Sequence, residues 1–308
     1  MGQHSDMGSS TASAFSTVGL IGRHGSPQIV DSLYVVGSFL RDHGVTVVVE
    51  DATAAMLGDG PLGDGPFERA LRQSLAERCD LIIVVGGDGS LLSVGRDLAP
   101  TGVPVLGVNR GGLGFLADVS PDQIGEKLAE VLAGEYVIED HFLLHARILR
   151  GEDELGSSPA LNDVVVHIGG MARIMEFSLW VDDEFVYDQR SDGLIVASPT
   201  GSTAYSLSAG GPIMHPRLDA IVVVPMFPHT LTSRPLVVPS ASEIRIIVSQ
   251  DAEVSCDSQV DFALKQDDEV RICKSAAPLR LVYSLGHSFY DSCRSKLDWA
   301  SRLGARSN

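Results

Sequence analysis

The chain has little positive charge for its length of 308 residues: 23 lysines and arginines stand against 40 aspartates and glutamates, for a formal net charge of −17. Such an excess of negative charge repels nucleic acids and anionic membrane surfaces. No apolar run approaches the roughly 20 residues that span a bilayer, and the N-terminus lacks the basic and then apolar pattern of a secretion signal. We therefore expect neither a nucleic-acid partner nor a membrane partner.

Cysteine is also scarce. The four cysteines, Cys79, Cys256, Cys273 and Cys293, show no Cys-x-x-Cys spacing. This pattern indicates neither a zinc site nor a disulfide framework, and reduced thiols favour a cytoplasmic location. Hydrophobic residues make up 44% of the chain and charged residues 20%, which is ordinary for a globular protein long enough to hold two domains.

The first half of the chain alternates apolar runs with amphipathic stretches, a pattern typical of βαβ units. Parallel strands are predicted at Thr17–Gly22, Val45–Val49, Leu81–Val85 and Val103–Val108, and helices at Pro27–His43 and Asp122–Ala133. We therefore predict a Rossmann-like α/β domain with a parallel sheet over residues 16–140. Residues 1–15 are expected to form a disordered tail.

The second half has short alternating runs separated by turn residues roughly every ten positions, which is an antiparallel β signature. Examples are Phe142–Leu149, Glu176–Val181, Glu243–Val248 and Arg280–Tyr283. The pattern predicts a β-rich domain, a β-sandwich, over residues 141–284. The C-terminal segment 285–308 is helix-like again and is expected to pack back on the first domain.

A glycine loop with one carboxylate, Gly86-Gly87-Asp88-Gly89, follows the buried strand Leu81–Val85 and precedes a helical pattern that Ser90 could cap. Glycines let backbone amides approach a phosphoryl group, and a helix N-terminus adds a favourable dipole. Asp88 would repel phosphate unless it binds a cation or takes a proton, so its presence indicates chemistry. The alternative is an aspartate that only caps a tight turn.

Two further motifs lie in the second half. Asn162-Asp163 starts a β-run, where it reads either as a ligand-binding pair or as an Asn-Asp turn that enters the strand. The strand after Asp192 runs into a loop rich in threonine, glycine and serine, whose hydroxyls and amides suit ribose and phosphate oxygens, and Tyr205 offers a ring for a base. A serine nucleophile is disfavoured because no Gly-x-Ser-x-Gly elbow is present.

Together these residues resemble the three signatures of the NAD kinases. The matching segments are Gly86–Gly89, Asn162–Asp163, Asp192–Gly193, Thr200–Ser206 and Gly210–Pro212, with Pro225–Thr230 and Ser255–Gln259 similar to bacterial members. The similarity covers nearly all of the chain from Thr17 to Leu303. The family usually carries Asn-Glu where this chain has Asn162-Asp163, so the carboxylate here is about one methylene shorter.

The resemblance implies ATP-dependent transfer of the γ-phosphoryl group to the 2′-hydroxyl of the adenosine ribose of NAD, giving NADP, with a divalent metal such as Mg²⁺. Such a reaction needs positioning and charge neutralisation more than covalent help. The resemblance makes Asp88 the catalytic base and the β-rich domain the NAD-binding domain. The residues that it implies for substrate binding are Gly87, Gly89, Asn162, Asp163, Arg173, Arg190, Asp192, Thr203, Ala204, Tyr205, Ser208 and Gln259. Metal ligands are not indicated.

In the family, the residues at the positions of Arg190 and Asp192 reach across a subunit interface, which implies a homodimer or homotetramer. Without the resemblance, Arg190 reads equally well as part of a solvated charge cluster with Asp188 and Asp192. Gln259 would then be a surface turn residue.

Two other functions remain open on the sequence alone. A nucleotide-binding sensor would keep the binding loops and could dispense with Asp88. The second function is that of another kinase with a Gly-Gly-Asp-Gly loop, of the lipid kinase or phosphofructokinase type. The negative charge disfavours a lipid kinase, and Ile21-Gly22-Arg23-His24-Gly25 is a poor match to the first glycine motif of a phosphofructokinase.

Overall fold

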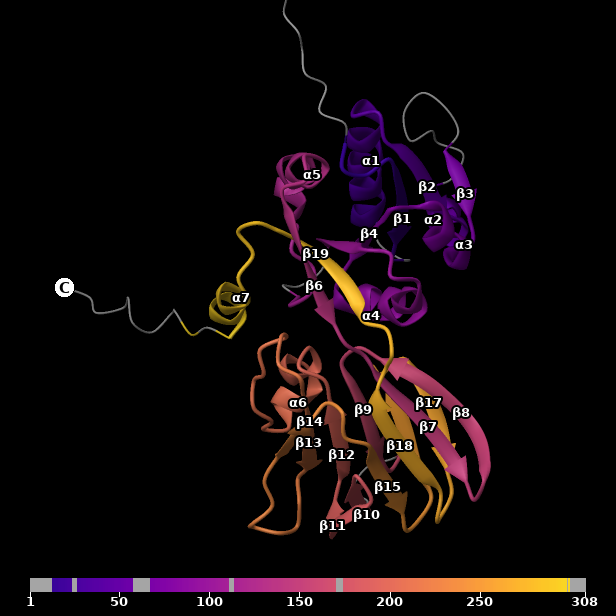
Figure 1. Ribbon diagram of the computed structural model, residues 1–308, viewed down its shortest axis with the longest axis vertical. Helices are drawn as coiled ribbons and strands as arrows, with labels where there is room; N and C mark the ends of the chain where they lie inside the picture. The colour runs from indigo at the N-terminus through magenta and orange to yellow at the C-terminus, as the bar shows by residue number, and fades with distance from the viewer. Residues whose placement is uncertain are drawn as a thin grey trace, which may run out of the picture. The chain divides into compact units, whose positions relative to one another are not determined.

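A computed structural model of the chain describes residues 13–23, 27–57, 67–110, 114–169, 174–297 and 299 (Figure 1). These residues form two compact units. The described residues of unit 1 fall within Met1–Ser90, Val103–Glu139 and Val282–Asn308, and those of unit 2 within Leu91–Gly102 and Asp140–Leu281. Across the described ranges, no helix combines the length and the apolar character needed to cross a bilayer.

Unit 1 is built on a mainly parallel sheet. In the described part of the chain, its strands are β1 (Thr17–Gly22), β2 (Thr46–Glu50), β3 (Glu68–Ala70), β4 (Leu81–Gly86), β5 (Val105–Asn109), β6 (Tyr136–His141) and β19 (Leu279–Ser284), in the order β3-β2-β1-β4-β5-β19-β6. The pairs from β3 to β5 are all parallel. Strand β4 is buried along its whole length, as expected for a parallel strand covered on both faces. The predicted Rossmann-like parallel sheet is confirmed.

Helices α1 (Pro27–Asp42), α2 (Asp51–Leu57) and α3 (Arg72–Arg78) contact this sheet, and α5 (Ile124–Leu132) contacts α1 (Figure 1). Helix α4 (Asp88–Leu98) begins in unit 1 and continues in unit 2, and α7 (Phe289–Lys296) belongs to unit 1. Helix α1 buries Ile29, Leu33, Val36 and Leu40, a stripe at helical spacing, in the core that includes the inward side chains of β1, β2 and β4.

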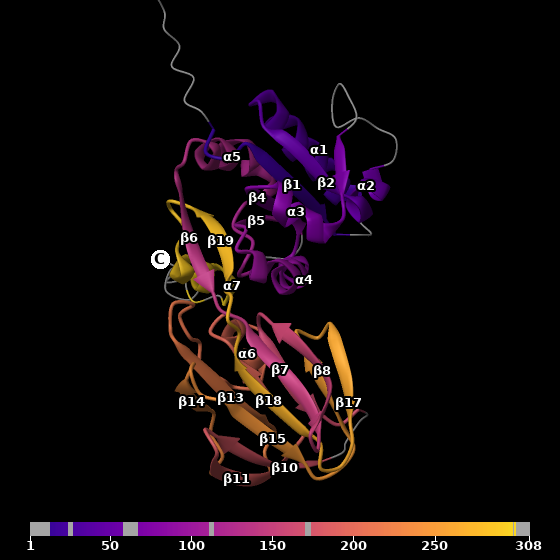
Figure 2. The same ribbon diagram turned by 45° about the vertical axis from the view of Figure 1, so that its right-hand side comes forward.

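Unit 2 is a sandwich of two antiparallel sheets (Figure 2). Within the described residues, one sheet has the order β11-β10-β15-β18-β7-β8 and the other β14-β13-β12-β9-β16-β17. The first contains β7 (Leu144–Arg150), β8 (Asp153–Ala160), β10 (Met175–Val181), β11 (Glu184–Ser191), β15 (Ile244–Val248) and β18 (Glu269–Lys274). The second contains β9 (Asp163–His167), β12 (Gly193–Ala197), β13 (Ala220–Met226), β14 (Leu236–Pro239), β16 (Ala252–Cys256) and β17 (Val260–Leu264).

One core joins the two sheets of unit 2. Phe177 and Ile246 of the first sheet and Val164, Val196 and Val254 of the second belong to the same buried cluster. The predicted β-sandwich is therefore confirmed. Strand β12 is buried on both faces, because a second cluster that includes Ile195, Ala197 and Met214 covers its other side. This double burial gives the loop that follows β12 a rigid support.

Two boundaries differ from the predicted ones. The strand at Arg280–Tyr283 was expected in the β-rich domain, yet β19 lies beside β5 in the seven-stranded sheet, and the division between the two units falls within it, between Leu281 and Val282. Leu281, Val282 and Tyr283 are all buried. The burial of this strand therefore does not tell whether it belongs to the sheet of unit 1 or to a sheet of unit 2. Residues 91–102, expected in the α/β domain, group with unit 2 because Gly95 lies against side chains of that unit and Arg96 binds Asp257.

The predicted tail, residues 1–15, overlaps the described residues only at Ser13–Phe15. There Phe15 is buried in the core of unit 1, and the Ala14 N–H donates to the Leu132 carbonyl at 2.8 Å. These three residues belong to the fold because an apolar side chain anchors them.

The packing of α1 predicts a clear difference between two alanine substitutions. Leu33→Ala should lower the free energy of unfolding by about 2–5 kcal/mol, because it leaves a cavity in the core. The matched change Val35→Ala, at a side chain that is 51% exposed on the same helix, should change it by no more than about 0.5 kcal/mol. Urea unfolding followed by circular dichroism measures both. Equal losses would contradict the placement of α1.

Candidate functional site

Asp88 is the first residue of α4, and its carboxylate binds the backbone of the segment that follows β5. Its Oδ2 accepts the N–H of Phe115 at 2.6 Å, and its Oδ1 accepts those of Leu116 at 3.2 Å and Ala117 at 3.4 Å. A Cβ on Gly114 would lie 1.9 Å from Oδ1, so glycine is required there. The carboxylate is thus fixed where β4 ends and α4 begins.

The glycine loop around Asp88 differs from the expected arrangement in one respect. Gly87 precedes α4 and Gly89 is its second residue, so Ser90 lies inside the helix instead of capping it. Ser90 Oγ is buried without a hydrogen-bond partner, and a Cβ on Gly86 would lie 2.4 Å from it. The Asp88 carboxylate binds the backbone of residues 115–117, which lie outside this turn. Its catalytic role stays a prediction, and so does the alternative that it only caps the turn.

The segment that Asp88 holds is fixed again at Asp118. Asp118 Oδ1 lies 2.8 Å from His287 Nδ1, and Oδ2 accepts the Ser284 hydroxyl at 3.0 Å. Burial alone would raise the pKa of Asp118, but the contacts with His287 and Ser284 outweigh it and lower the pKa. Lys296 Nζ lies 4.3 Å from the ring centre of Phe115, and burial lowers the pKa of this lysine. Unit 1 thus has a cation beside the segment that carries the Asp88 contacts.

In unit 2, Asn162 and Asp163 stand at the start of β9, and a third aspartate holds their backbone. Asp257 Oδ1 accepts the N–H groups of Asn162 at 2.8 Å and Asp163 at 3.3 Å, and Oδ2 accepts that of Leu161 at 2.9 Å. The Asp257 side chain is fully buried and pairs with Arg96 at 2.9 Å. The sequence analysis did not assign Asp257 a role. Its only signal was its place in the segment Ser255–Gln259.

Asp163 itself is a buried carboxylate, 3% exposed. Burial, and then the negative charge of Asp257, raise its pKa from 3.8 to about 7, while a backbone hydrogen bond from Tyr205 works in the opposite direction. Asp163 therefore changes its charge near neutral pH.

The loop rich in threonine, glycine and serine packs directly on this turn. The Ser198 N–H donates to the Asn162 carbonyl at 2.9 Å, and the Ser198 hydroxyl donates to the Leu161 carbonyl at 2.5 Å. A Cβ on Gly201 would lie 2.0 Å from the Asn162 carbonyl oxygen, so no other residue fits there without a shift of backbone. The second and third motifs are thus brought together as one structure.

Beyond Gly201 the chain forms a 3-10 turn at Gly201–Thr203 and helix α6 (Tyr205–Ser208). Ser202 pins this loop, because its hydroxyl donates to the Pro199 carbonyl at 2.6 Å and accepts the Met214 N–H at 2.9 Å. Tyr205 is 43% exposed. Thr203 and Ala204 are half-buried, and Ser208 is exposed. These four predicted residues therefore present accessible groups next to Asp163.

Arg190 and Asp192 lie at the opposite end of β12 from Asp163. In the register, Asp163 pairs with Ala197, whereas Gly193, which directly follows Asp192, pairs with His167. Four steps along a strand span about 13 Å. Within one chain, the structure does not bring Arg190 and Asp192 together with Asn162 and Asp163.

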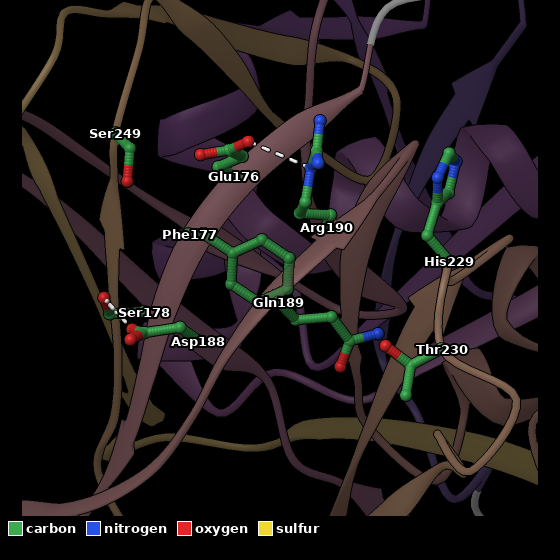
Figure 3. A pocket seen from close by; sticks show the side chains of 9 residues that line it. All are labelled: Glu176, Phe177, Ser178, Asp188, Gln189, Arg190, His229, Thr230 and Ser249. Atoms are coloured by element: carbon green, nitrogen blue, oxygen red, sulfur yellow. Dashed lines mark hydrogen bonds and ion pairs between the residues drawn. The ribbon is translucent and has the colours of Figure 1, made fainter.

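Arg190 instead lines a cavity of about 780 Å³ at the β10–β11 hairpin (Figure 3). Its Nε lies 2.9 Å from Glu176 Oε1, and both side chains are about half exposed, at 62% and 49%. An ion pair so exposed contributes little to stability. The residues that line the cavity are Glu176, Phe177, Ser178, Asp188, Gln189, Arg190, His229, Thr230 and Ser249.

Two predicted residues need separate mention. Arg173 lies outside the described residues. Gln259 is exposed and its Oε1 accepts a hydrogen bond from Arg96 Nη2 at 2.6 Å, so it is linked to the Asn162–Asp163 turn through Arg96 and Asp257.

Across the described residues, no group of three or more histidine, cysteine, aspartate or glutamate side chains is placed to hold a metal ion.

A carboxylate at a glycine-rich strand-to-helix turn, in a chain whose other unit presents a hydroxyl-rich loop and an exposed tyrosine, is the arrangement of a nucleotide-dependent phosphotransferase. Residues 18–136 match the ATP-NAD kinase N-terminal domain, and residues 161–284 match the ATP-NAD kinase C-terminal domain. The chain belongs to the NAD kinase family.

Curated relatives agree with this assignment. The chain is 51% identical over 296 residues to the NAD kinase of Pseudomonas putida strain GB-1, covering 95% of this chain and 98% of the relative. It is also 51% identical over 294 residues to the NAD kinase of Pseudomonas aeruginosa strain LESB58, covering 94% and 98%.

Two solved structures share the fold. Yeast NADH kinase complexed with NADH has a TM-score of 0.85 at 25% identity, covering 95% of this chain and 90% of that one. An NAD kinase from Archaeoglobus fulgidus in complex with ATP has a TM-score of 0.70 at 24% identity, covering 92% and 97%.

The raised pKa of Asp163 predicts a pH-dependent difference in stability. Between the ordinary pKa of 3.8 and about 7, the folded chain keeps a proton on Asp163 that the unfolded chain releases. Its contribution therefore destabilises the fold progressively as the pH rises through this window. Asp163→Asn removes that contribution, so the melting temperature of the variant relative to the unmodified chain should be higher at pH 8 than at pH 5. Thermal unfolding at both values measures it, and a constant difference would contradict the assignment.

Proposed function

We propose that this chain transfers the γ-phosphoryl group of ATP to the 2′-hydroxyl of the adenosine ribose of NAD, giving NADP. The observation that carries the proposal is the Asp88 carboxylate, held by backbone donors at the first residue of α4, in the glycine-rich turn that follows β4. Membership of the NAD kinase family supports the choice of donor and acceptor.

Asp88 acts as the base in this proposal. A carboxylate is a much weaker base than an alkoxide, so it accepts the proton of the ribose hydroxyl only as the phosphoryl group is transferred. Each carboxylate oxygen has two lone pairs, so the three N–H groups that Asp88 accepts leave capacity for a further hydrogen bond. The contacts fix the position of the base before the substrate binds.

Nucleotide recognition falls to unit 2. Asn162 and Asp163 hydrogen-bond hydroxyls of the ribose or of the nicotinamide side, while Thr203, Ala204 and Ser208 line the pocket for the adenosine. Tyr205, exposed beside this loop, offers its ring to a base. Gly87 and Gly89 offer backbone amides to phosphate oxygens.

A divalent cation, most simply Mg²⁺, accompanies the ATP. Mg²⁺ is usually held through one or two carboxylates together with phosphate oxygens and water, so it does not require a cluster of three protein ligands. It would supply positive charge to the transferred phosphoryl group. The four free cysteines, three of them buried, fit the reducing cytoplasm.

The first test measures NADP formed from NAD and ATP, with inorganic polyphosphate as a second donor. With ATP, Asp88→Asn should lower kcat by about 10²–10⁴-fold, because it removes the proton acceptor. NAD affinity should change less than kcat, because Asn162 and Asp163 of unit 2 bind NAD in this proposal. The asparagine NH2 faces one or more of the N–H groups of residues 115–117, so that segment loses part of its support. A nucleotide sensor would form no NADP even with the unmodified chain.

The control for Asp88→Asn is Gly114→Ala, which keeps the carboxylate but forces its contact segment to move. If Asp88 only organised the turn, the two variants would lose turnover and thermal stability together. Near-normal turnover of Asp88→Asn would end the assignment of the base.

The opposite placement of Arg190 and Asp163 along β12 supports a second expectation: Arg190 and Asp192 complete the site of a neighbouring copy in a homodimer or homotetramer. Asp88→Asn and Arg190→Ala chains, each nearly inactive alone, should regain part of their activity when mixed and allowed to exchange subunits. Co-expression with two affinity tags, followed by an NADP assay, measures it. A fully active monomer in sedimentation would rule out the shared site.

A further inference from the structure

Asp257 has one feature that is costly for a fold. Its carboxylate is fully buried, and a buried charge is expensive even when it is paired, so packing alone does not account for its presence. The backbone at Asp257 and at Ser258 has positive φ values of 53° and 54°, as the tight turn between β16 and β17 requires of its two central residues. A tight turn thus places a buried charge next to the Asn162–Asp163 turn.

The hydrogen bonds of Asp257 show what this arrangement achieves. The N–H groups of three consecutive residues, 161 to 163, converge on one carboxylate. The Asp257 N–H returns a bond to the Asp163 carbonyl at 2.9 Å. These bonds fix the backbone of residues 161 to 163, where the chain enters β9.

Arg96 completes the cluster from α4. Its Nη1 binds Asp257 and its Nη2 binds Gln259 at 2.6 Å, and its side chain is only 10% exposed. The planar guanidinium matches this two-partner geometry, which a lysine cannot reproduce. The cluster therefore also holds Gln259.

We propose that Asp257 is a positioning residue, which together with Arg96 holds the Asn162–Asp163 turn in the conformation that binds NAD. The inference rests on the proposed function in one respect, that NAD is the ligand of this turn. Asp257 acts through the backbone of residues 161 to 163 and has no contact with the reacting atoms.

The test compares two buried aspartates of unit 2. Asp257→Asn keeps the side-chain shape but turns an N–H donor toward the Leu161 N–H or toward Arg96, so the turn loses part of its support. Asp268→Asn is the matched control: Asp268 is also fully buried, binds Arg150 through two contacts of 2.8 Å, and accepts the Lys265 N–H at 2.7 Å.

The expected result is specific to NAD. Asp257→Asn should raise the KM for NAD, and the NAD dissociation constant measured by calorimetry, by about ten-fold or more, as for a buried donor left unpaired. The KM for ATP should stay within about two-fold of that of the unmodified chain, because only the acceptor site is disturbed. Asp268→Asn should lower thermal stability by a similar amount and leave both KM values unchanged.

A milder variant keeps the test decisive if Asp257→Asn does not fold. Arg96→Lys preserves the charge beside Asp257 but loses one of the two contacts, so it should raise the KM for NAD by about two- to five-fold at nearly normal thermal stability. An unchanged KM for NAD in a folded variant overturns the proposal. An equal change for ATP, or the same rise in Asp268→Asn, overturns it as well.

A pH profile adds a readout that a purely structural role would not move. The charged and titratable groups around Asp163 include Asp257 and the Cys256 thiol, whose pKa burial raises to about 12, and Arg96 pairs with Asp257. Asp257→Asn removes a negative charge and leaves Arg96, so the pKa of Asp163 should fall and the pH dependence of NAD binding that follows Asp163 should shift to lower pH. The calorimetric measurement of NAD binding does not require turnover. A chain that binds NAD without forming NADP would therefore refute the proposed function, while the dissociation constants would still test the role of Asp257.

Discussion

Backbone N–H groups in irregular segments need acceptors, and in this chain two aspartate carboxylates provide them. Asp88 accepts the N–H groups of residues 115 to 117, and Asp257 accepts those of residues 161 to 163. Buried polar backbone groups are almost always paired, so each carboxylate determines the conformation of a segment that no sheet or helix could fix. The irregular parts of the site are therefore as well defined as the strands that carry them.

These carboxylates also add to the negative charge of the protein, which affects how it binds its substrates. A chain with a net charge of −17 has to receive substrates that carry several negative phosphates. Long-range attraction is unavailable, so the proposed recognition relies on local donors: glycine amides, serine and threonine hydroxyls, and single cations such as Lys296. The half-buried Lys296 above Phe115 places one positive charge in the unit that contains Asp88. Binding in this family member is thus a matter of short-range geometry more than of overall charge.

Sequence patterns were sufficient wherever the information is local. The apolar runs located β1, β4 and α1 to within a residue or so, and the spacing of glycines and hydroxyls located the motifs around Asp88 and Tyr205. Sequence patterns failed where a residue's role depends on partners that are distant in the sequence. The pattern around Arg280–Tyr283 predicts a strand but does not say which sheet receives it. The role of Asp257 depends on partners more than 90 residues away, and nothing in its own neighbourhood reports them.

The approach of Gly201 to Asn162 ties together two segments that are 39 positions apart in the chain. No side chain fits between that glycine and the Asn162 carbonyl, so the two backbones must match each other in shape to within a fraction of an ångström. Gene shuffling among homologues meets this limit directly. A crossover placed between residues 163 and 198 combines the turn of one parent with the loop of another. The contact between the two parents, here called the seam, is then made by backbone atoms, which later side-chain mutations do not change. Chimeras that inherit residues 161–163, 198–203 and 257 from a single parent avoid the seam.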